Sequence, residues 1–425
     1  MKIRPRRLIA LVMAIFMGAL CGGCMVSSVE ELYSLPALSE EYVQLQELIA
    51  QRIDAGGEYA APTGGSYRQS IQLQDLDGDG TAEALAFLAD STHTPTICIY
   101  RQDEDGNYYL YVIIAGEGSA VASVEYADLT GDGASELIIA WQISGSIRLL
   151  SVYALSTQEQ LLSVDCSEFL VCDMDGDGKA ELMDLRTDYS AGSSMGLYSF
   201  DANGKASSST AALSEGVTDV RRLRAGTLSD GTPALFAESD RDDDLVTDVF
   251  ALRDGELWNI TMTDAGYSDT LRRGDIFATD INNDRAMEIP SRDGDLLQWY
   301  SLDAAGNRAL VMTTFHDFDD GWYLELTGLL SQDAVTVERS YTAVGERAVT
   351  FTVAGSGAEP PRAVLIVYAL TGENRLDRGT AEGRFILRQE EGTVYAAQIL
   401  AGDLTAEEIE SDFNLIYAEW QSGDI

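Results

Sequence analysis

Short apolar runs separated by polar turns extend through most of the chain. Val, Ile, Leu, Tyr and Phe make up the runs, and Gly, Asp, Asn and Ser lie between them. This pattern is typical of β-strands. It predicts strands at Glu83 to Leu88, Thr96 to Tyr100, Tyr108 to Ile114 and Val121 to Tyr126, and it continues to about residue 317. We therefore expect a mainly β fold.

The segments that flank this region have a different pattern. Ser39 to Ile53 carries apolar residues at helical spacing and stops at Gly56, which predicts an amphipathic helix that packs on the strands. Residues 318–425 are interpreted as a small α+β domain without a catalytic signature. Its closing helix starts with a capping box of Thr405 and Glu408, and its apolar face continues to Trp420. The strands predicted in this domain are Trp322 to Leu326, Ala334 to Arg339, Ala348 to Val353, Ala363 to Leu370, Gly383 to Leu387 and Val394 to Leu400.

A nine-residue acidic motif divides the strand region into repeats. Clear copies start at Asp75, Asp128, Asp173 and Asp280. An eroded copy, the fourth in chain order, starts at Gly226, so the copy at Asp280 is the fifth loop. Successive copies start 53, 45, 53 and 54 residues apart. Four short strands fit within one step, and a repeat of about 50 residues with four strands has the size of a β-propeller blade. We expect a β-propeller over residues 68–317 with five blades, and six or seven blades stay open as alternatives.

The acidic motifs have the chemistry of calcium loops. Calcium prefers about six to eight oxygen ligands, and without a cation the neighbouring carboxylates of one loop would repel one another. Glycines such as Gly78 and Gly80 let the backbone curl tightly. The predicted ligands are Asp75, Asp77, Asp79, Thr81 through its carbonyl, and Glu83 in the first loop; Asp128, Thr130, Asp132, Ala134 and Glu136 in the second; Asp173, Asp175, Asp177, Lys179 and Glu181 in the third; and Asp280, Asn282, Asp284, Ala286 and Glu288 in the fifth.

These loops are not equal in charge. The first and third loops offer four carboxylates each, whereas Thr130 replaces an acid in the second loop. Arg285 replaces the second glycine of the fifth loop, which makes that loop the weakest candidate. The alternative for every loop is a solvated Asp-Gly turn without a metal.

The loops are not EF-hands, because the twelfth positions hold Ala86, Ile139, Asp184 and Ser291 where an EF-hand needs Glu. With their spacing, the motifs resemble the FG-GAP or VCBS repeat of integrin-α-like propellers over residues 68–317. The resemblance implies blades in which an Asp-rich loop between two strands holds Ca²⁺.

The N-terminus has the pattern of an export signal. Basic residues precede an apolar run from Leu8 to Leu20, which is too short for a membrane span. The run ends in Cys21-Gly22-Gly23-Cys24, which resembles the lipobox of bacterial lipoproteins and implies Cys24 as the lipidated residue; Cys21, or an ordinary cleaved signal peptide, is the alternative. We expect a signal peptide at 1–23, a tether and helix at 24–67, and a protein of the cell envelope that is lipid-anchored to the membrane and faces outside.

Composition limits the functions that remain. The net charge of −42 argues against nucleic-acid binding. Only His93 and His316 occur, both expected in exposed turns, so histidine-based catalysis and zinc sites lack their usual residue. Gly192 to Gly196 matches Gly-x-Ser-x-Gly, yet a nucleophile elbow needs a strand before it and a helix after it.

We therefore expect a non-catalytic propeller that binds an unidentified protein or glycan. The alternatives are a polysaccharide-active enzyme with paired carboxylates and an envelope assembly scaffold. Cys98, Cys166 and Cys172 are expected as buried thiols, with a Cys166–Cys172 disulfide as the alternative.

Overall fold

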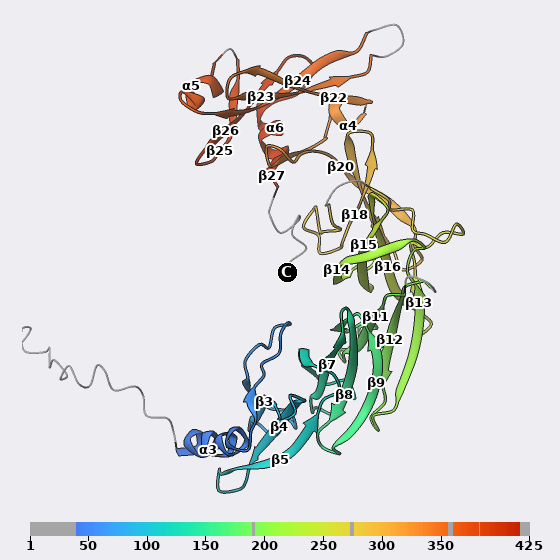
Figure 1. The fold of residues 1–425 in the computed structure, drawn as a ribbon. Helices are drawn as coiled ribbons and strands as arrows, with labels where there is room; N and C mark the ends of the chain where they lie inside the picture. The colour runs from blue at the N-terminus through green and yellow to red at the C-terminus, as the bar shows by residue number, and fades with distance from the viewer. Residues whose placement is uncertain are drawn as a thin grey trace, which may run out of the picture.

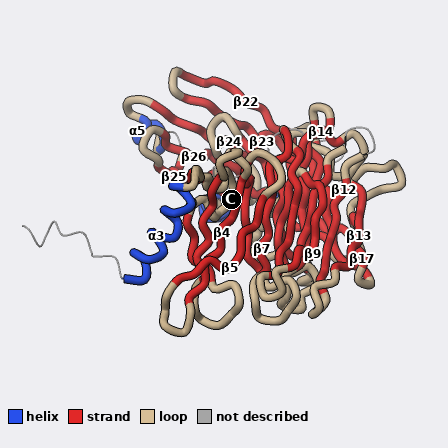
Figure 2. Tube along the Cα trace, turned by 60° about the horizontal axis from the view of Figure 1, so that its bottom comes forward, coloured by secondary structure: helices blue, strands red, loops and turns tan. Residues whose placement is uncertain are grey.

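The computed structural model describes residues 40–188, 192–272, 276–332, 334–355, 360–381 and 383–416. The expected signal peptide, the lipidation residue Cys24 and the end of the expected closing helix at Trp420 lie outside the described residues. Within them the fold is mainly β, as the apolar pattern predicts (Figure 1 and Figure 2). None of the described helices is long and apolar enough to span a membrane.

Five antiparallel sheets follow one another along the chain, which is the number of blades that the repeat predicts. The strands of each sheet pair mostly with their neighbours in sequence; in the first sheet β1 and β2 both pair with β3, and in the fifth β27 from near the end of the chain pairs with β21. Their strands are β1 (Glu58–Tyr59), β2 (Ile71–Gln74), β3 (Glu83–Ala89), β4 (Pro95–Gln102) and β5 (Tyr108–Ala115); β6 (Ala120–Ala127), β7 (Glu136–Ser144), β8 (Ile147–Ala154) and β9 (Glu159–Cys166); β10 (Glu168–Cys172), β11 (Glu181–Arg186), β12 (Ser194–Phe200) and β13 (Ala206–Ala212); β14 (Val217–Thr227), β15 (Pro233–Arg241), β16 (Asp244–Arg253) and β17 (Glu256–Asn259); and β18 (Ile289–Asp293), β19 (Leu296–Leu302), β20 (Arg308–Asp317), β21 (Trp322–Glu325) and β27 (Phe413–Leu415).

A sixth sheet and four helices complete the described chain. The strand order of this sheet is β22-β23-β24-β26-β25. Its strands are β22 (Val335–Ala343), β23 (Glu346–Val353), β24 (Arg362–Thr371), β25 (Phe385–Gln389) and β26 (Thr393–Ile399), and the helices are α3 (Glu40–Asp54), α4 (Leu329–Gln332), α5 (Arg375–Gly379) and α6 (Ala406–Asp412).

The structure corrects two expectations about the C-terminal segment. The strand at Trp322 pairs with β20 and so extends the fifth sheet rather than opening a separate domain. The closing helix has its capping box at Thr405, but it ends at Asp412, because Phe413 to Leu415 form a strand that pairs with β21. The driving force is burial: Phe413 stacks on Trp322 and contacts Tyr395, each at a ring-centroid distance of 5.4 Å.

Neighbouring sheets pack face to face through buried apolar clusters. Phe87 and Trp141 belong to the cluster between the first and second sheets, and Leu235 with Met183 to that between the third and fourth. Corresponding clusters join the second sheet to the third, the fourth to the fifth and the fifth to the sixth. The sheets therefore stack as propeller blades do, with side chains of adjacent blades forming each core.

The row of sheets is curved, and in the described residues its two ends carry different elements (Figure 1). Helix α3 covers the free face of the first sheet through Leu45 and Ile49, which pack on Ala86 and Tyr100. The fifth sheet packs on the sixth, and α5 contacts β24 and β26 on the far face of that sixth sheet. No apolar cluster of the described residues joins the first sheet to the fifth.

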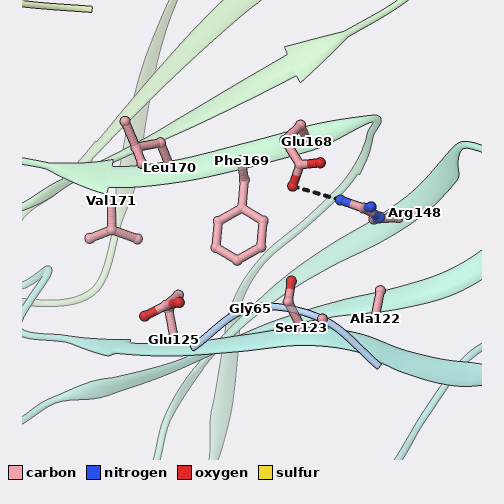
Figure 3. Close-up of a pocket in the computed structure, with 10 residues that line it drawn as sticks. Gly65, Ala122, Ser123, Glu125, Arg148, Glu168, Phe169, Leu170 and Val171 are labelled. Carbon is pink, nitrogen blue, oxygen red and sulfur yellow. Dashed lines mark hydrogen bonds and ion pairs between the residues drawn. The ribbon is translucent and has the colours of Figure 1, made fainter. Parts of the chain in front are cut away.

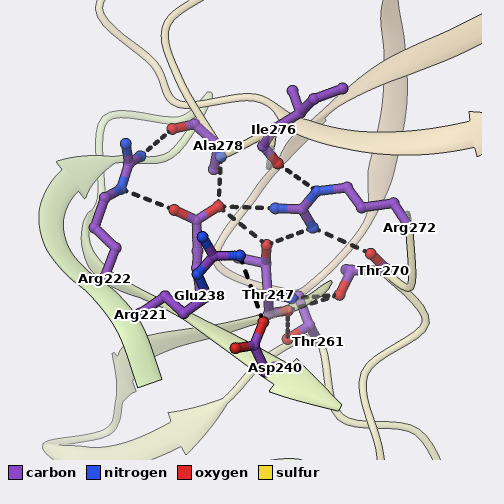
Figure 4. Close-up of polar contacts among 10 residues, drawn as sticks. All are labelled: Arg221, Arg222, Glu238, Asp240, Thr247, Thr261, Thr270, Arg272, Ile276 and Ala278. Atoms are coloured by element: carbon purple, nitrogen blue, oxygen red, sulfur yellow. Dashed lines mark hydrogen bonds and ion pairs between the residues drawn. The ribbon is translucent and has the colours of Figure 1, made fainter. Parts of the chain in front are cut away.

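The fourth sheet, whose loop has lost most of its acids, contains a buried ionic group (Figure 4). Glu238 forms ion pairs with Arg222 at 2.8 Å and with Arg272 at 2.9 Å, and all three side chains are at most 5% exposed. Burial raises the pKa of Glu238 and lowers the pKa of Arg272 to about 10. The Ala278 amide and the Thr247 hydroxyl also donate to Glu238, so the group is closely satisfied.

The cysteines and histidines take specific places. Cys98, Cys166 and Cys172 are free thiols; Cys98 and Cys166 are buried, as the favoured interpretation predicts, whereas Cys172 is only partly buried. His93 lies in an exposed turn with a φ of 61°. His316, in contrast to the expectation, is buried, because its ring stacks between Tyr323 and Phe318. Burial lowers the pKa of His316 to about 3.

Candidate metal centres

The acidic loops lie at one edge of successive sheets. The first three join β2 to β3, β6 to β7 and β10 to β11, and the fifth closes with a bridge between Thr279 and Glu288 just before β18. Adjacent loops touch, since the Ser135 amide donates to the Leu76 carbonyl at 2.9 Å and the Met287 amide to the Thr227 carbonyl at 2.9 Å.

All four clear loops share one backbone frame. The glutamate at the ninth position is buried and accepts a hydrogen bond from the amide of the second residue. The distances are 2.8 Å from Leu76 to Glu83, 2.8 Å from Leu129 to Glu136, 2.7 Å from Met174 to Glu181 and 3.0 Å from Ile281 to Glu288. The first aspartate accepts two further amides, as Asp75 does from Gly78 and Gly80. Hydrogen bonds within each loop therefore fix its tightly turned backbone.

The fifth loop keeps this frame despite its substitution. Arg285 has a φ of 79°, close to the 89° of Gly80 at the same position of the first loop. Such a positive φ strains any residue with a Cβ atom. The Arg285 amide donates to Asp280 as the Gly80 amide does to Asp75. The second donor is the amide of Asp284, the fifth residue of the loop, whereas in the first loop it is that of Gly78, the fourth residue. The substitution therefore adds strain to the loop without changing its path.

Two of the four predicted sites bring their acids together. Carboxylate oxygens of Asp75, Asp77 and Glu83 lie within 4.8 Å of one another, and so do those of Asp173, Asp175 and Glu181. The aspartate at the fifth position of each of these two loops does not join the cluster but braces the backbone. Asp79 accepts a hydrogen bond from the Thr81 amide, and Asp177 accepts one from the Lys179 amide. Three of the four predicted carboxylates therefore meet in each of these loops.

The second and fifth loops gather no such trio within the described part of the chain. In the second loop, Asp132 accepts from the Ala134 amide, while Glu136 accepts from the hydroxyl and amide of Thr130. In the fifth, Asp284 accepts from the Asn282 side chain and from the Ala286 amide. These oxygens accept hydrogen bonds from the protein itself.

Burial sets the electrostatics of the glutamates. It raises the pKa values of Glu83, Glu136 and Glu181, and that of Glu288 to about 7. The Oε1 atoms of Glu181 and Glu288 are buried without a hydrogen-bond partner. A buried carboxylate oxygen without a partner is costly, and a hard cation relieves that cost. The third loop, with three gathered carboxylates and one buried oxygen without a partner, therefore has the chemistry to hold a metal ion.

The first loop contains a charge that the sequence analysis missed. Arg101, from β4, forms ion pairs with Asp77 at 3.1 Å and with Glu83 at 3.5 Å. A guanidinium thus lies against two of the three acids of this loop. The loop motif gives no sign of it, because Arg101 follows the motif by 18 residues and reaches the site only through strand pairing.

A pocket of about 390 Å³ lies away from the loops, between β6 and β10 (Figure 3). Ser123 and Glu125 line one side, Phe169 the other, and burial raises the pKa of Glu125. Arg148 and Glu168 form an ion pair of 2.6 Å at its rim. Sequence reasoning missed this pocket, because its residues come from two repeats and match no motif.

The comparisons with known proteins agree with the repeat. A family profile described as FG-GAP-like repeat matches residues 75–139, which span the first two acidic loops. No curated protein matches the chain. Similar solved structures include rhamnogalacturonan lyase YesW (18% identity, TM-score 0.31, 70% of this chain and 59% of that one), the Dos1 propeller (10%, 0.28, 80% and 82%) and the β-propeller domain of the Trilobed protease from Pyrococcus furiosus (13%, 0.27, 71% and 91%).

The chain thus spans less than two thirds of the lyase. The chain thus contains an FG-GAP-like repeat at residues 75–139, within a row of five successive antiparallel sheets that stack as β-propeller blades do.

Proposed function

We propose that this protein is a calcium-binding propeller of the cell envelope that binds a protein or a glycan without chemical turnover. The observation that carries the calcium part is the third loop, where Asp173, Asp175 and Glu181 converge and the buried Glu181 Oε1 has no hydrogen-bond partner. Calcium would be held by these carboxylates, and its charge would offset their mutual repulsion.

Thermal unfolding with and without a chelator tests the calcium part. A site with a Kd typical of extracellular modules adds about 1.4 kcal/mol at a tenfold excess of Ca²⁺. For a chain of this size that corresponds to a shift of about 2–4 °C in Tm. We expect EDTA to lower Tm and Asp175→Asn to remove the response. An unchanged Tm would contradict the proposal.

The envelope location rests on the N-terminal sequence. Lipidation at Cys24 would tether the acidic body to the membrane surface through lipid alone. Expression of the full chain in a bacterial host, followed by fractionation, tests this. We expect the protein in the membrane fraction and Cys24→Ala in the soluble fraction. Equal distribution of the two would contradict the tether.

The pocket between β6 and β10 supports ligand binding. It combines an aromatic ring, Phe169, with carboxylates and a hydroxyl, which suits polar ligands that also have apolar faces. A glycan array and a pull-down with the intact chain separate the two classes of ligand. Phe169→Ala is expected to abolish binding to whichever class is found, with Val344→Ala, a fully exposed site, as the control.

The same pocket favours one second candidate, a polysaccharide-active enzyme. Glu125, whose pKa is raised by burial, could act as an acid, while Glu168 lies in the same pocket as an ion-pair partner of Arg148. Incubation of the pure protein with acidic and neutral polysaccharides tests this candidate. Product formation that is lost in Glu125→Gln would replace the binding proposal with this one.

A further inference from the structure

One strand position distinguishes the repeats from one another. In each of four sheets a tyrosine lies on the strand that pairs with the strand after the acidic loop. It is paired with the residue that follows the loop glutamate: Tyr100 with Ala84, Tyr153 with Leu137, Tyr198 with Leu182 and Tyr300 with Ile289. The residue after each tyrosine therefore lies opposite the glutamate itself. These residues are Arg101, Ala154, Ser199 and Ser301. The first sheet alone among these four has a charged residue there.

Arg101 is held firmly in that place. Its side chain is 17% exposed, and its guanidinium carbon lies 4.0 Å from the centre of the Tyr111 ring. Tyr111 is itself fixed by the hydrogen bond from its hydroxyl to the Leu155 carbonyl at 2.9 Å. Cation–π contact and the two ion pairs to Asp77 and Glu83 act together on one rigid group. Removing Arg101 from the loop would break all of them.

The third loop has the same acids without this cation. Ser199 takes the position of Arg101, and Glu181, 1% exposed, keeps an oxygen without a partner beside Asp173 and Asp175. The basic residue of the loop, Lys179, donates instead to the Phe200 carbonyl at 2.7 Å. The first loop is thus neutralised by the chain, whereas the third is not.

We infer that Arg101 is a built-in cation that replaces the metal in the first loop, so that Ca²⁺ binds at the third loop and not at the first. The two positive charges exclude each other, because a Ca²⁺ between Asp75, Asp77 and Glu83 would meet the guanidinium at contact distance. Arg101 also takes the oxygens that the ion would need. The assignment of the third loop rests on the proposed function, whereas the exclusion from the first loop does not.

A reciprocal exchange tests the inference in the full-length chain, with calcium stoichiometry measured by isothermal titration calorimetry. Arg101→Ser gives the first sheet the residue that the third sheet has at this position, and we expect the number of Ca²⁺ ions bound per chain to rise by one. Ser199→Arg gives the third sheet the residue of the first sheet, and we expect the number of bound Ca²⁺ ions to fall by one. Arg101→Lys retains the charge and is expected to leave the stoichiometry unchanged. Circular dichroism melts show that each variant is folded.

The outcomes separate the inference from the proposed function. If the unmodified protein binds no Ca²⁺ and Arg101→Ser gains one ion, the inference stands and the calcium proposal for the third loop fails. If Asp77→Asn lowers the stoichiometry of the unmodified protein, the first loop is a metal site and the inference is overturned. No gain in Arg101→Ser overturns it equally; should that variant not fold, the loss in Ser199→Arg decides the matter.

Discussion

One residue, His316, is expected to make the stability of the protein depend on pH. Its pKa is lowered to about 3 in the folded protein because its ring is buried among Trp299, Phe318 and Tyr323. The unfolded chain takes up a proton near pH 6.5, whereas the folded one does not. The stabilising effect is therefore complete above pH 6.5 and declines as the pH falls toward 3.

We expect the free energy of unfolding to drop by about 2 kcal/mol from this residue between pH 8 and pH 5. Urea unfolding at both pH values, compared with His316→Gln, measures this contribution. The variant should lose about that much less on acidification. If the unmodified protein and His316→Gln lose the same stability on acidification, His316 is accessible to protons in the folded state.

Glu238 is the second residue with a large expected effect. Glu238→Gln would leave the buried Arg222 and Arg272 without their counter-ion. Breaking a buried ion pair in this way costs about 3–5 kcal/mol. Chemical denaturation measures it, and Asp240→Asn, which breaks a partly exposed pair with Arg221, is a control expected to cost about 1 kcal/mol or less. Equal effects would mean that the fourth sheet does not depend on its ionic group.

The candidate site shows how far single residues can be predicted. Asp75, Asp77 and Glu83 are identified from their spacing because local loop geometry brings them together. Asp79 is missed as a loop brace, since the same residue type serves either role. Arg101 and the pocket residues depend on pairing between distant strands, and a motif contains no information about that register.

At the scale of elements, the first acidic loop contributes to contact between neighbouring sheets. A Cβ atom on Gly78 would lie 2.6 Å from the Gly133 carbonyl oxygen of the second loop, whereas one on Gly80 would meet nothing within 4 Å. Both glycines have a positive φ, of 74° and 89°. The two positions therefore separate backbone strain from a clash between sheets.

We expect Gly80→Ala to cost about 1–2 kcal/mol, from strain alone, and Gly78→Ala to cost clearly more, because the two loops must also move apart. Thermal unfolding of both variants in EDTA makes the comparison independent of metal. A cost no larger for Gly78→Ala would indicate that the contact between the loops is readily displaced.

Many of the elements follow from the apolar pattern, whereas the short helices α4 and α5 and the strand at Phe413 do not. Strands such as Glu83–Ala89 and the helix Glu40–Asp54 lie where the sequence predicts them. The segment after Asp412 has apolar residues that fit a helix as well as a strand. Pairing with β21 and burial of Phe413 decide in favour of the strand, and both are long-range effects that periodicity does not contain.

At the scale of the whole molecule, the C-terminal sheet is joined to the fifth sheet through a single core. Phe413 is 1% exposed within the cluster that also contains Phe315 and Phe351. We expect Phe413→Ala to cost about 3–5 kcal/mol and to increase hydrogen exchange in β21 and β26 together. Exchange confined to β27 would show that the two sheets unfold independently.

The helices at the two ends of the row have a consequence for assembly. A bare blade face is an apolar surface that fits the bare face of another copy, so uncovered ends would allow molecules to join into filaments. Leu45 and Ile49 of α3 cover one end, and α5 covers part of the other. The helices should therefore keep the blades of one molecule from stacking on those of another. Concentrated solutions should then remain free of such filaments.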